Sequence, residues 1–326
     1  MSRAAALPAT PWRLRVREHP YLVSLVLLAV AVLLNYLLQD NLFQLRVVNG
    51  NLRVMLPLMV LAAGQALVIV GGGIDLSVGA TVSLVNVILV TLVTPESSWD
   101  GVLLGALAGL AAGALAGAVN GFCVAYLRLQ PIVTTYATSF LYFGLALAIL
   151  PRPGGALPRA LTSFYRSAPL GLPATAYGVA LLLLVWLLLR RTRFVQHLYA
   201  VGGREASARS SGVAVTRVRF LSYVLMGVFA AFAAMALTLS TGSGNARLGD
   251  AMTLSSIVAV VLGGTRLSGG QGGVTGAVVG VALLTVIRNL ITFANVPTWY
   301  QTLVDALVIL LALAGPGLVR LVRRGA

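Results

Sequence analysis

The chain of 326 residues has no lysine, one cysteine and two histidines, and these shortages exclude several kinds of site. The single cysteine, Cys123, can form neither an internal disulfide nor a cysteine metal cluster. His19 and His197 lie far apart in the sequence, each near arginine, so we expect no metal site and no histidine-based nucleophile. An ATP-binding loop of the form G-x-x-x-x-G-K-[ST] needs a lysine, so if ATP drives this protein, another chain binds it.

Charged residues are scarce as well, at 10% of the chain, whereas a soluble domain has about a quarter of its residues charged. Hydrophobic residues make up 59%, and the mean hydropathy is +0.94. Apolar runs of ~20 residues recur along the whole length, and each can cross a hydrocarbon layer of ~30 Å. These runs are continuous, whereas a transmembrane barrel alternates apolar and polar residues in strands of ~10 residues. The sequence therefore predicts an all-α fold, a polytopic bundle of membrane helices.

About ten transmembrane helices are expected, with both termini cytoplasmic. The first apolar run follows three arginines, as in a signal peptide, but no small-residue cleavage site comes after it. We therefore predict that this run is an uncleaved span. The ten predicted spans cover residues 21–38, 54–70, 78–94, 102–125, 132–150, 175–189, 218–240, 251–264, 274–291 and 302–319.

The net charge is +15, and a nucleic-acid partner would be the usual explanation for such a charge. The arginines instead gather at the ends of the apolar runs, which indicates loop orientation rather than phosphate binding. With a cytoplasmic N-terminus, sixteen arginines lie on the inner side and seven on the outer side. The predicted layout is an inner tail at 1–20, a membrane domain at 21–319 and an inner tail at 320–326. An outer loop at 151–174 and an inner loop at 190–217 are either functional surfaces or simple connectors.

Two glycine-rich stretches resemble each other. Residues 72–79 read GGIDLSVG and residues 263–270 read GGTRLSGG, so both fit GG-x-x-L-S-x-G. A structural duplication explains the match, and so does chance in a chain with 35 glycines. Glycines loosen or end a helix, and the freed backbone groups then need partners in protein or in a wet cavity. We expect helix breaks or a gate formed by Gly72, Gly73, Asp75, Ser77, Gly79, Gly263, Gly264, Arg266, Ser268 and Gly270.

Asp75 is a carboxylate inside roughly forty residues that otherwise look like membrane. A charge at the bilayer centre costs ~2.5–3.5 kcal/mol on insertion scales, so Asp75 is either close to the cytoplasmic interface or paired. One reading is a helix cap, in which its side chain accepts a hydrogen bond from the N–H of Val78. The other reading is a charge at a gate, and the two roles are compatible.

Neutral polar residues are scattered through the predicted spans. They can hydrogen-bond across helices or line a hydrated path for a neutral polyol. Deep acids and histidines are too few for a proton relay or for a membrane enzyme. We therefore expect a pathway without its own chemical drive, and its possible lining residues are Gln65, Asn86, Asn120, Thr134, Tyr136, Ser255 and Asn289.

The chain resembles the permease subunits of bacterial ABC importers for ribose and related monosaccharides in four stretches. In order they are GGIDLSVG at 72–79, AVNGFCVAYLRLQPIVTT at 118–135, LLLRRTRFVQHLYAVGGREASARSSGV at 187–213 and IVAVVLGGTRLSGGQGGVTGAVVGVALL at 257–284. The resemblance implies a multi-pass permease in the bacterial inner membrane, surrounded by lipid, that is not itself an enzyme. It also implies a second permease copy, identical or homologous, a periplasmic or lipoprotein sugar-binding protein, and a cytoplasmic ATPase subunit that holds ATP and Mg²⁺. No cofactor is expected in this chain.

The resemblance assigns the inner loop the role of docking on the ATPase. From the residues alone, Arg204 to Ser211 can form a short helix that follows two glycines and stops at a third. The coupling residues are then Gly202, Gly203, Arg204, Glu205, Arg209 and Gly212. The outer loop at 151–174 would face the binding protein.

Three positions depart from the family pattern. The family usually has acids in a Glu-Leu-Asp pattern where this chain has Thr253-Leu254-Ser255. It often has arginine where Phe143 stands, and commonly a neutral residue where Arg288 stands. These departures leave the identity of the transported solute undetermined. A nucleoside, a furanose or another small polar solute is the alternative to a ribose-like sugar, and a secondary carrier is the alternative mechanism.

Overall fold

The computed structural model describes residues 21–39 and 41–293, with single positions at 297, 300, 303, 306 and 307. The predicted tails at 1–20 and 320–326 and the tenth predicted span lie outside this part, apart from three isolated positions of that span. The described residues form helices and no strand, so the all-α prediction is confirmed for them. The helices are α2 (Tyr21–Leu38), α3 (Leu45–Val70), α4 (Val78–Leu92), α5 (Trp99–Ala125), α6 (Pro131–Ile149), α7 (Arg159–Arg166), the 3₁₀ turn η1 (Pro169–Gly171), α8 (Ala174–Leu189), α9 (Arg193–Gly203), α10 (Glu205–Ser210), α11 (Val215–Thr241), α12 (Met252–Leu262) and α13 (Val274–Phe293).

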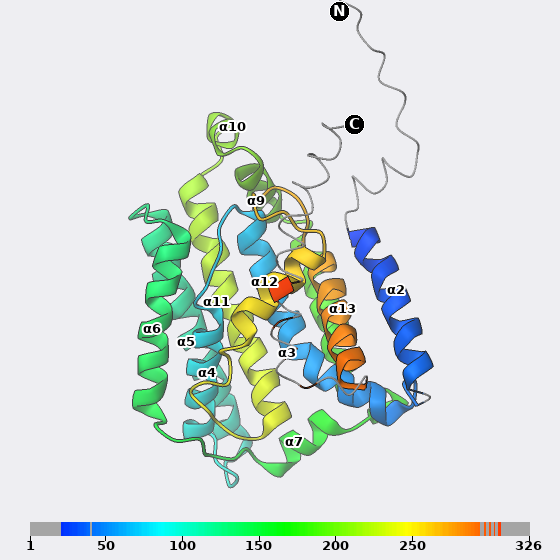
Figure 1. Cartoon of the computed structure of the whole chain (residues 1–326). Helices are drawn as coiled ribbons and strands as arrows, with labels where there is room; N and C mark the ends of the chain where they lie inside the picture. Colours follow the sequence, from blue (N-terminus) through cyan, green and yellow to red (C-terminus); the bar gives the residue numbers. More distant parts are fainter. Residues whose placement is uncertain are drawn as a thin grey trace, which may run out of the picture.

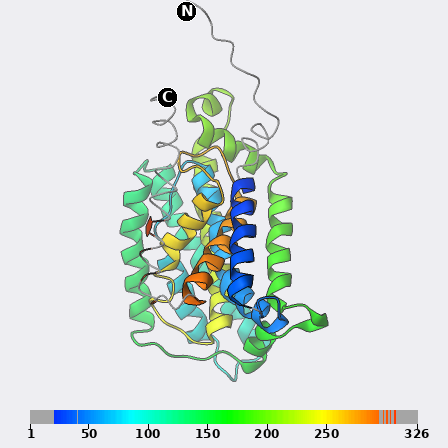
Figure 2. The same ribbon diagram turned by 45° about the vertical axis from the view of Figure 1, so that its right-hand side comes forward.

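Helix α3 lies at the centre of the bundle (Figure 1). All its residues from Met55 to Val70 are buried, which fits a helix that is apolar on every side. It packs against α8, α11, α12 and α13, while α2 lies at the outside against α13 (Figure 2). Helices α2 and α6 leave many large apolar side chains exposed, as expected for helices that face lipid or another membrane subunit.

Six described helices are long and apolar enough to cross a membrane, namely α2, α3, α5, α6, α11 and α13. The number is seven if the pair formed by residues 159–171 and α8, which is bent by 85°, is counted as one span. Helices α4 and α12 have 15 and 11 residues, hence lengths of about 22 Å and 16 Å, short of the ~30 Å hydrocarbon layer. Ten complete crossings are therefore not confirmed, because the predicted spans 78–94 and 251–264 are each too short to cross alone.

Helices α4 and α12 begin side by side in the interior and run to opposite ends of the bundle. The N–H of Gly79 donates to Thr253 Oγ1 at 3.1 Å, and the N–H of Gly249 donates to Ser83 Oγ at 2.9 Å. From there α4 descends to the end that carries α7, while α12 rises to the end that carries α9 and α10 (Figure 1). The two short helices together extend over about 38 Å, so they divide one crossing between two distant parts of the chain.

The contact between α5 and α11 is made by backbone. Glycines recur every fourth residue along one side of α5, and a Cβ added at Gly117 would overlap the carbonyl oxygen of Tyr223. On α11, a Cβ at Gly227 would overlap the carbonyl oxygen of Gly113. Small residues at this spacing let membrane helices approach closely, where van der Waals packing holds them together.

We predict that Gly227→Ala lowers the stability of the folded protein by about 1–3 kcal/mol, because α5 and α11 must separate to admit the methyl group. The matched control is Gly144→Ala on α6, where an added Cβ meets nothing within 4 Å. Thermal unfolding of the detergent-solubilised chains measures both. Equal melting temperatures for the two variants would contradict the backbone contact.

Candidate functional site

Three chain segments meet through their backbones at the α9–α10 end of the bundle. A Cβ added at Gly202 would overlap the carbonyl oxygen of Val70, the last residue of α3. The same carbonyl accepts a hydrogen bond of 2.9 Å from the N–H of Gly270. A Cβ at Gly269 would lie 2.8 Å from the Gly202 carbonyl oxygen and 3.1 Å from the Cα of Gly72. The structure thus brings the predicted coupling segment into contact with both glycine motifs.

Helices α3 and α12 end in the same way. Gly71 and Gly263 have φ of −72° and −69°, and the following residues, Gly72 and Gly264, both have φ of +83°. At both helix ends, the N–H of the next residue donates a hydrogen bond to the carbonyl five residues earlier. This is the Schellman arrangement, which glycine favours.

The structural match is shifted by one residue from the sequence match. Gly71 and not Gly72 corresponds to Gly263, so Asp75 and Arg266 do not occupy equivalent positions. Past the shared turn the two segments diverge, because one enters the bundle interior and the other forms an exposed loop that includes Arg266 and Ser268.

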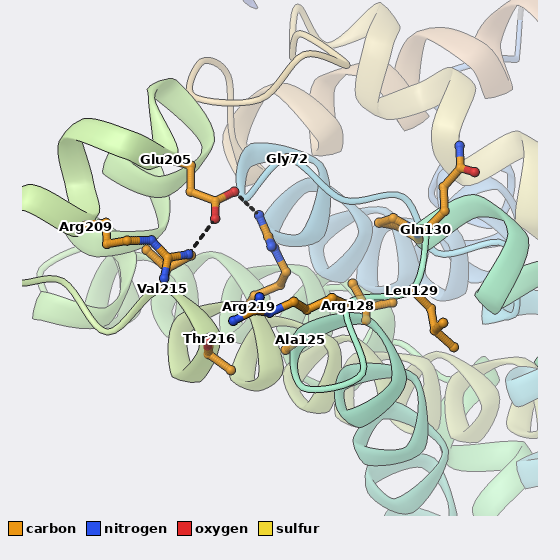
Figure 3. Close-up of a pocket in the computed structure, with 12 residues that line it drawn as sticks. Gly72, Ala125, Arg128, Leu129, Gln130, Glu205, Arg209, Val215, Thr216 and Arg219 are labelled. Atoms are coloured by element: carbon orange, nitrogen blue, oxygen red, sulfur yellow. Dashed lines mark hydrogen bonds and ion pairs between the residues drawn. The ribbon is translucent and has the colours of Figure 1, made fainter.

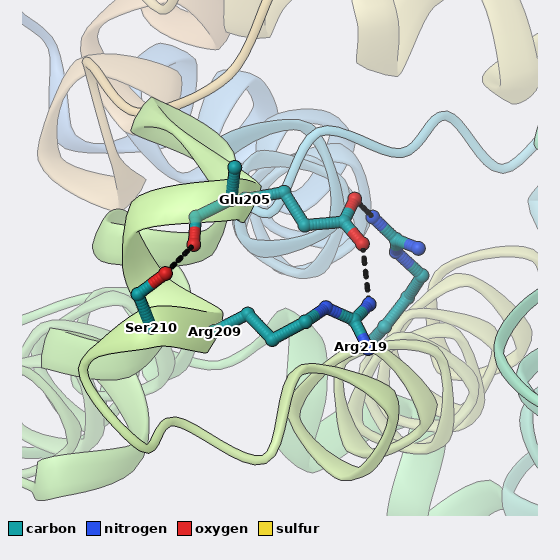
Figure 4. A network of polar contacts seen from close by, with 5 residues as sticks. Glu205, Arg209, Ser210 and Arg219 are labelled. Atoms are coloured by element: carbon teal, nitrogen blue, oxygen red, sulfur yellow. Dashed lines mark hydrogen bonds and ion pairs between the residues drawn. The ribbon is translucent and has the colours of Figure 1, made fainter.

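Glu205 clamps α10 to α11. Its carboxylate forms ion pairs with the guanidinium of Arg219 at 2.8 Å and with that of Arg209 at 2.9 Å (Figure 4). Hydrogen bonds from Arg219 and then Arg209 hold the pKa of the Glu205 carboxyl below its ordinary value. The expected short helix at Arg204–Ser211 is confirmed as α10, and Gly212, with φ of +80°, ends it. Sequence reasoning missed Arg219, because nothing in the spacing shows that α11 returns beneath α10.

A cavity of about 460 Å³ lies beneath this clamp (Figure 3). Glu205 and Arg219 form one side, Gly72 another, and the segment between α5 and α6 a third. In that segment Arg128 has φ of +56°, a left-handed conformation that costs a non-glycine residue of order 1–3 kcal/mol. The coupling segment and the first glycine motif therefore border one cavity.

Asp75 is buried and hydrogen-bonded. Its Oδ1 accepts from the N–H of Ser77 at 2.8 Å and from Ser77 Oγ at 2.7 Å, and its Oδ2 accepts from Asn120 Nδ2 at 3.3 Å. Asn120 Oδ1 in turn accepts from Thr138 Oγ1 and from the hydroxyl of Tyr142. The expected bond to the N–H of Val78 is wrong, since the bond is made one residue earlier. The network ties the α3–α4 connection to α5 and α6.

The other polar residues proposed for a pathway have partners within the protein. Gln65 Nε2 donates to the Asp75 carbonyl at 3.3 Å, and Asn86 Nδ2 donates to Thr238 Oγ1 at 2.7 Å. Similar bonds join Thr134 Oγ1 to Gln130 O, Arg288 to Ser255 Oγ, and Asn289 to Asn51. Tyr136 differs, because its ring is exposed and lines a second cavity. Whether a solute passes these residues stays a prediction.

Comparison with known proteins identifies relatives of this chain. Residues 47–313 match the family model for the permease component of the branched-chain amino acid transport system. Ribose import permease protein RbsC of Bacillus subtilis (strain 168) is 35% identical over 302 residues, which are 90% of each chain. Galactose/methyl galactoside import permease protein MglC of Escherichia coli (strain K12) is 32% identical over 313 residues, 90% of this chain and 92% of that protein.

Autoinducer 2 import system permease protein LsrC of Enterobacter sp. (strain 638) is 36% identical over 275 residues, 81% of this chain and 76% of that protein. No solved structure matches. The match to the family model covers most of the chain, and the ribose and galactose import permeases align over at least 90% of their lengths. The chain therefore belongs to this family of transport-system permease components.

Proposed function

We propose that this chain is the membrane permease subunit of an ATP-driven importer that carries a monosaccharide across the bacterial inner membrane. The observation that carries the proposal is the backbone contact of Gly202 with both Val70 and Gly270. The α9–α10 segment thereby touches the end of α3, which leads into α4, and the loop that follows α12. The family description names amino acids, whereas the relatives reported above are import permeases for ribose, galactosides and autoinducer 2, and the proposal follows these relatives.

In this mechanism α9 and α10 receive motion and pass it to the pathway. Closely packed backbones have no side chain between them that could absorb a displacement, so a shift of Gly202 moves the end of α3 and the loop at 263–273. The end of α3 continues into α4, and the loop at 263–273 follows α12. Helices α4 and α12 are the two short helices that meet in the interior. Broken helices of this kind form the moving walls of many membrane transporters.

The expected partners fit the same geometry. The arginine distribution supports a cytoplasmic position for the α9–α10 end, where a separate ATPase subunit would bind ATP and Mg²⁺ and dock on α10. The exposed Arg204 and Arg209 offer charged contacts there. A sugar-binding protein, periplasmic or lipid-anchored, would deliver the solute at the α7 end, and a second permease copy would complete the pore. The alternative cargo is a nucleoside, a furanose or another small polar solute, since one of the relatives is an import permease for autoinducer 2 and not for a named sugar.

Gly202→Ala should uncouple ATP hydrolysis from uptake, because the added methyl group forces α9 away from the end of α3. Gly203→Ala is the matched control, since its Cβ would meet nothing within 4 Å. Both variants are assembled with the ATPase and binding protein in proteoliposomes, and sugar uptake per ATP hydrolysed is measured. A ratio that is unchanged in Gly202→Ala, or that falls as much in Gly203→Ala, would count against the contact.

Arg219→Gln should release α10 from α11, because Glu205 then keeps only its exposed partner Arg209. Amide hydrogen exchange across 205–213 is expected to speed up, and transport to fall. The control is Arg217→Gln on the same helix, since Arg217 is exposed and has no ion pair within the described residues. Because the folded pKa of Glu205 is lowered, the clamp should hold above the ordinary carboxyl pKa and weaken as the pH falls through the folded value. Exchange that is identical in all three proteins would exclude the clamp.

The energy source separates this importer from a secondary carrier. We expect uptake of radiolabelled ribose or galactose to require ATP and to persist when a proton uncoupler is added with ATP maintained. Uptake by the purified chain alone, driven by an ion gradient, would refute the proposed function.

A further inference from the structure

A cavity of about 450 Å³ opens beside the point where α4 and α12 begin. Its walls combine aromatic rings from α6, namely Tyr136, Phe140 and Phe143, with two charged residues, Arg247 and Asp250, from the segment before α12. The cavity falls within the range of ~300–1,000 Å³ that small-molecule sites occupy. Neither Arg247 nor Asp250 was singled out by sequence reasoning, which placed both in or near an outer loop.

The position of this segment makes the two charges unusual. The backbone of Gly249 packs against Gly79, the second residue of α4, so Asp250 lies beside the start of α4. Helix α4 is about 22 Å long and runs from there to the α7 end. Asp250 thus lies at a depth of about 20 Å from that end. Charged residues within the membrane layer are costly and are candidates for a functional site.

The two charged side chains make few contacts with the rest of the fold. Arg247 places its guanidinium carbon 5.2 Å from the centroid of the Phe143 ring. The Asp250 carboxylate has no hydrogen bond and no ion pair within the described residues, and its side chain is exposed to the cavity. The Asp250 carboxylate and the N–H groups of Arg247, which is exposed although it lies over Phe143, are therefore available to a solute.

We propose that this cavity is a contact site for a neutral sugar in transit, a step that rests on the proposed function. The Asp250 carboxylate accepts hydrogen bonds from sugar hydroxyls, since an ionised carboxylate offers about four acceptor positions. Arg247 donates to the hydroxyl and ring oxygens. The exposed ring of Tyr136 packs against an apolar C–H face of the sugar, and the Phe143 ring holds the guanidinium of Arg247 at the site. A few polar groups set in an aromatic wall are what fixes orientation in small-molecule sites.

The test uses the full importer in proteoliposomes, with radiolabelled ribose and galactose as probes. Asp250→Asn keeps the shape but loses the charge and one acceptor group, and we expect sugar uptake to fall at least tenfold. Stimulation of the ATPase by the loaded binding protein should stay at the wild-type level. Asp250→Glu should recover part of the uptake. Asp100→Asn, which removes a carboxylate at the N-terminal turn of α5, outside the cavity, is the matched control and should transport normally.

Phe143→Leu tests the aromatic wall independently and keeps the proposal testable if Asp250→Asn fails to fold. It should lower uptake severalfold with the same ATPase stimulation. Wild-type uptake in folded Asp250→Asn or in Phe143→Leu would overturn the contact site and leave the proposed function standing. A wild-type assembly that hydrolyses ATP but takes up no sugar would overturn the proposed function, and the contact site with it.

Discussion

The demand for backbone hydrogen bonds inside a membrane governs this structure. An unpaired amide in hydrocarbon costs several kcal/mol, so a chain that leaves the helical path at depth must find partners in the protein. The segment between α3 and α4 finds them in Thr135, whose hydroxyl accepts from the N–H of Leu76 at 2.9 Å, and in the side chain of Asp75. The segment before α12 finds them in Asn86 and Ser83. The first role of these buried polar residues is to make possible the non-helical segments that precede α4 and α12.

Glycine permits the close backbone contacts of this structure. At the ends of α3 and α12, and along the face between α5 and α11, backbones touch with no side chain between them. Such contacts place rigid elements against each other instead of deformable side chains. The same residue type thus ends helices at 72 and 264 and permits close packing at 202 and 227, for two different physical reasons.

The sequence predicted which segments form helices better than it predicted how long those helices are. Continuous apolar runs locate α2, α3, α5, α6, α11 and α13, because burial in lipid needs such runs. The same property made α4 and α12 look like full crossings, since composition does not distinguish a helix that starts at the surface from one that starts in the interior. The glycine repeat was found, but glycine alone cannot set its register, and the backbone angles place Gly263 with Gly71.

Site residues were predicted unevenly for a similar reason. Glu205 and the glycines of its segment stand out locally, whereas Arg219 gains meaning only when α11 folds back beneath α10. Asp250 looked like a loop acid, because only the folded chain shows that its loop turns back into the bundle.

The close approach of Gly202, Val70 and Gly270 also bears on how this sequence can change over time. A β-carbon at Gly202 fits only if Val70 and Gly270 withdraw, and a β-carbon at Gly270 fits only if the Gly202–Gly203 backbone withdraws. Single replacements at these two glycines are therefore blocked, and drift at this junction has to proceed through coordinated changes in three regions of the chain, each some 70 to 130 positions from the next. Such a junction behaves as one inherited unit, although no short stretch of sequence contains it.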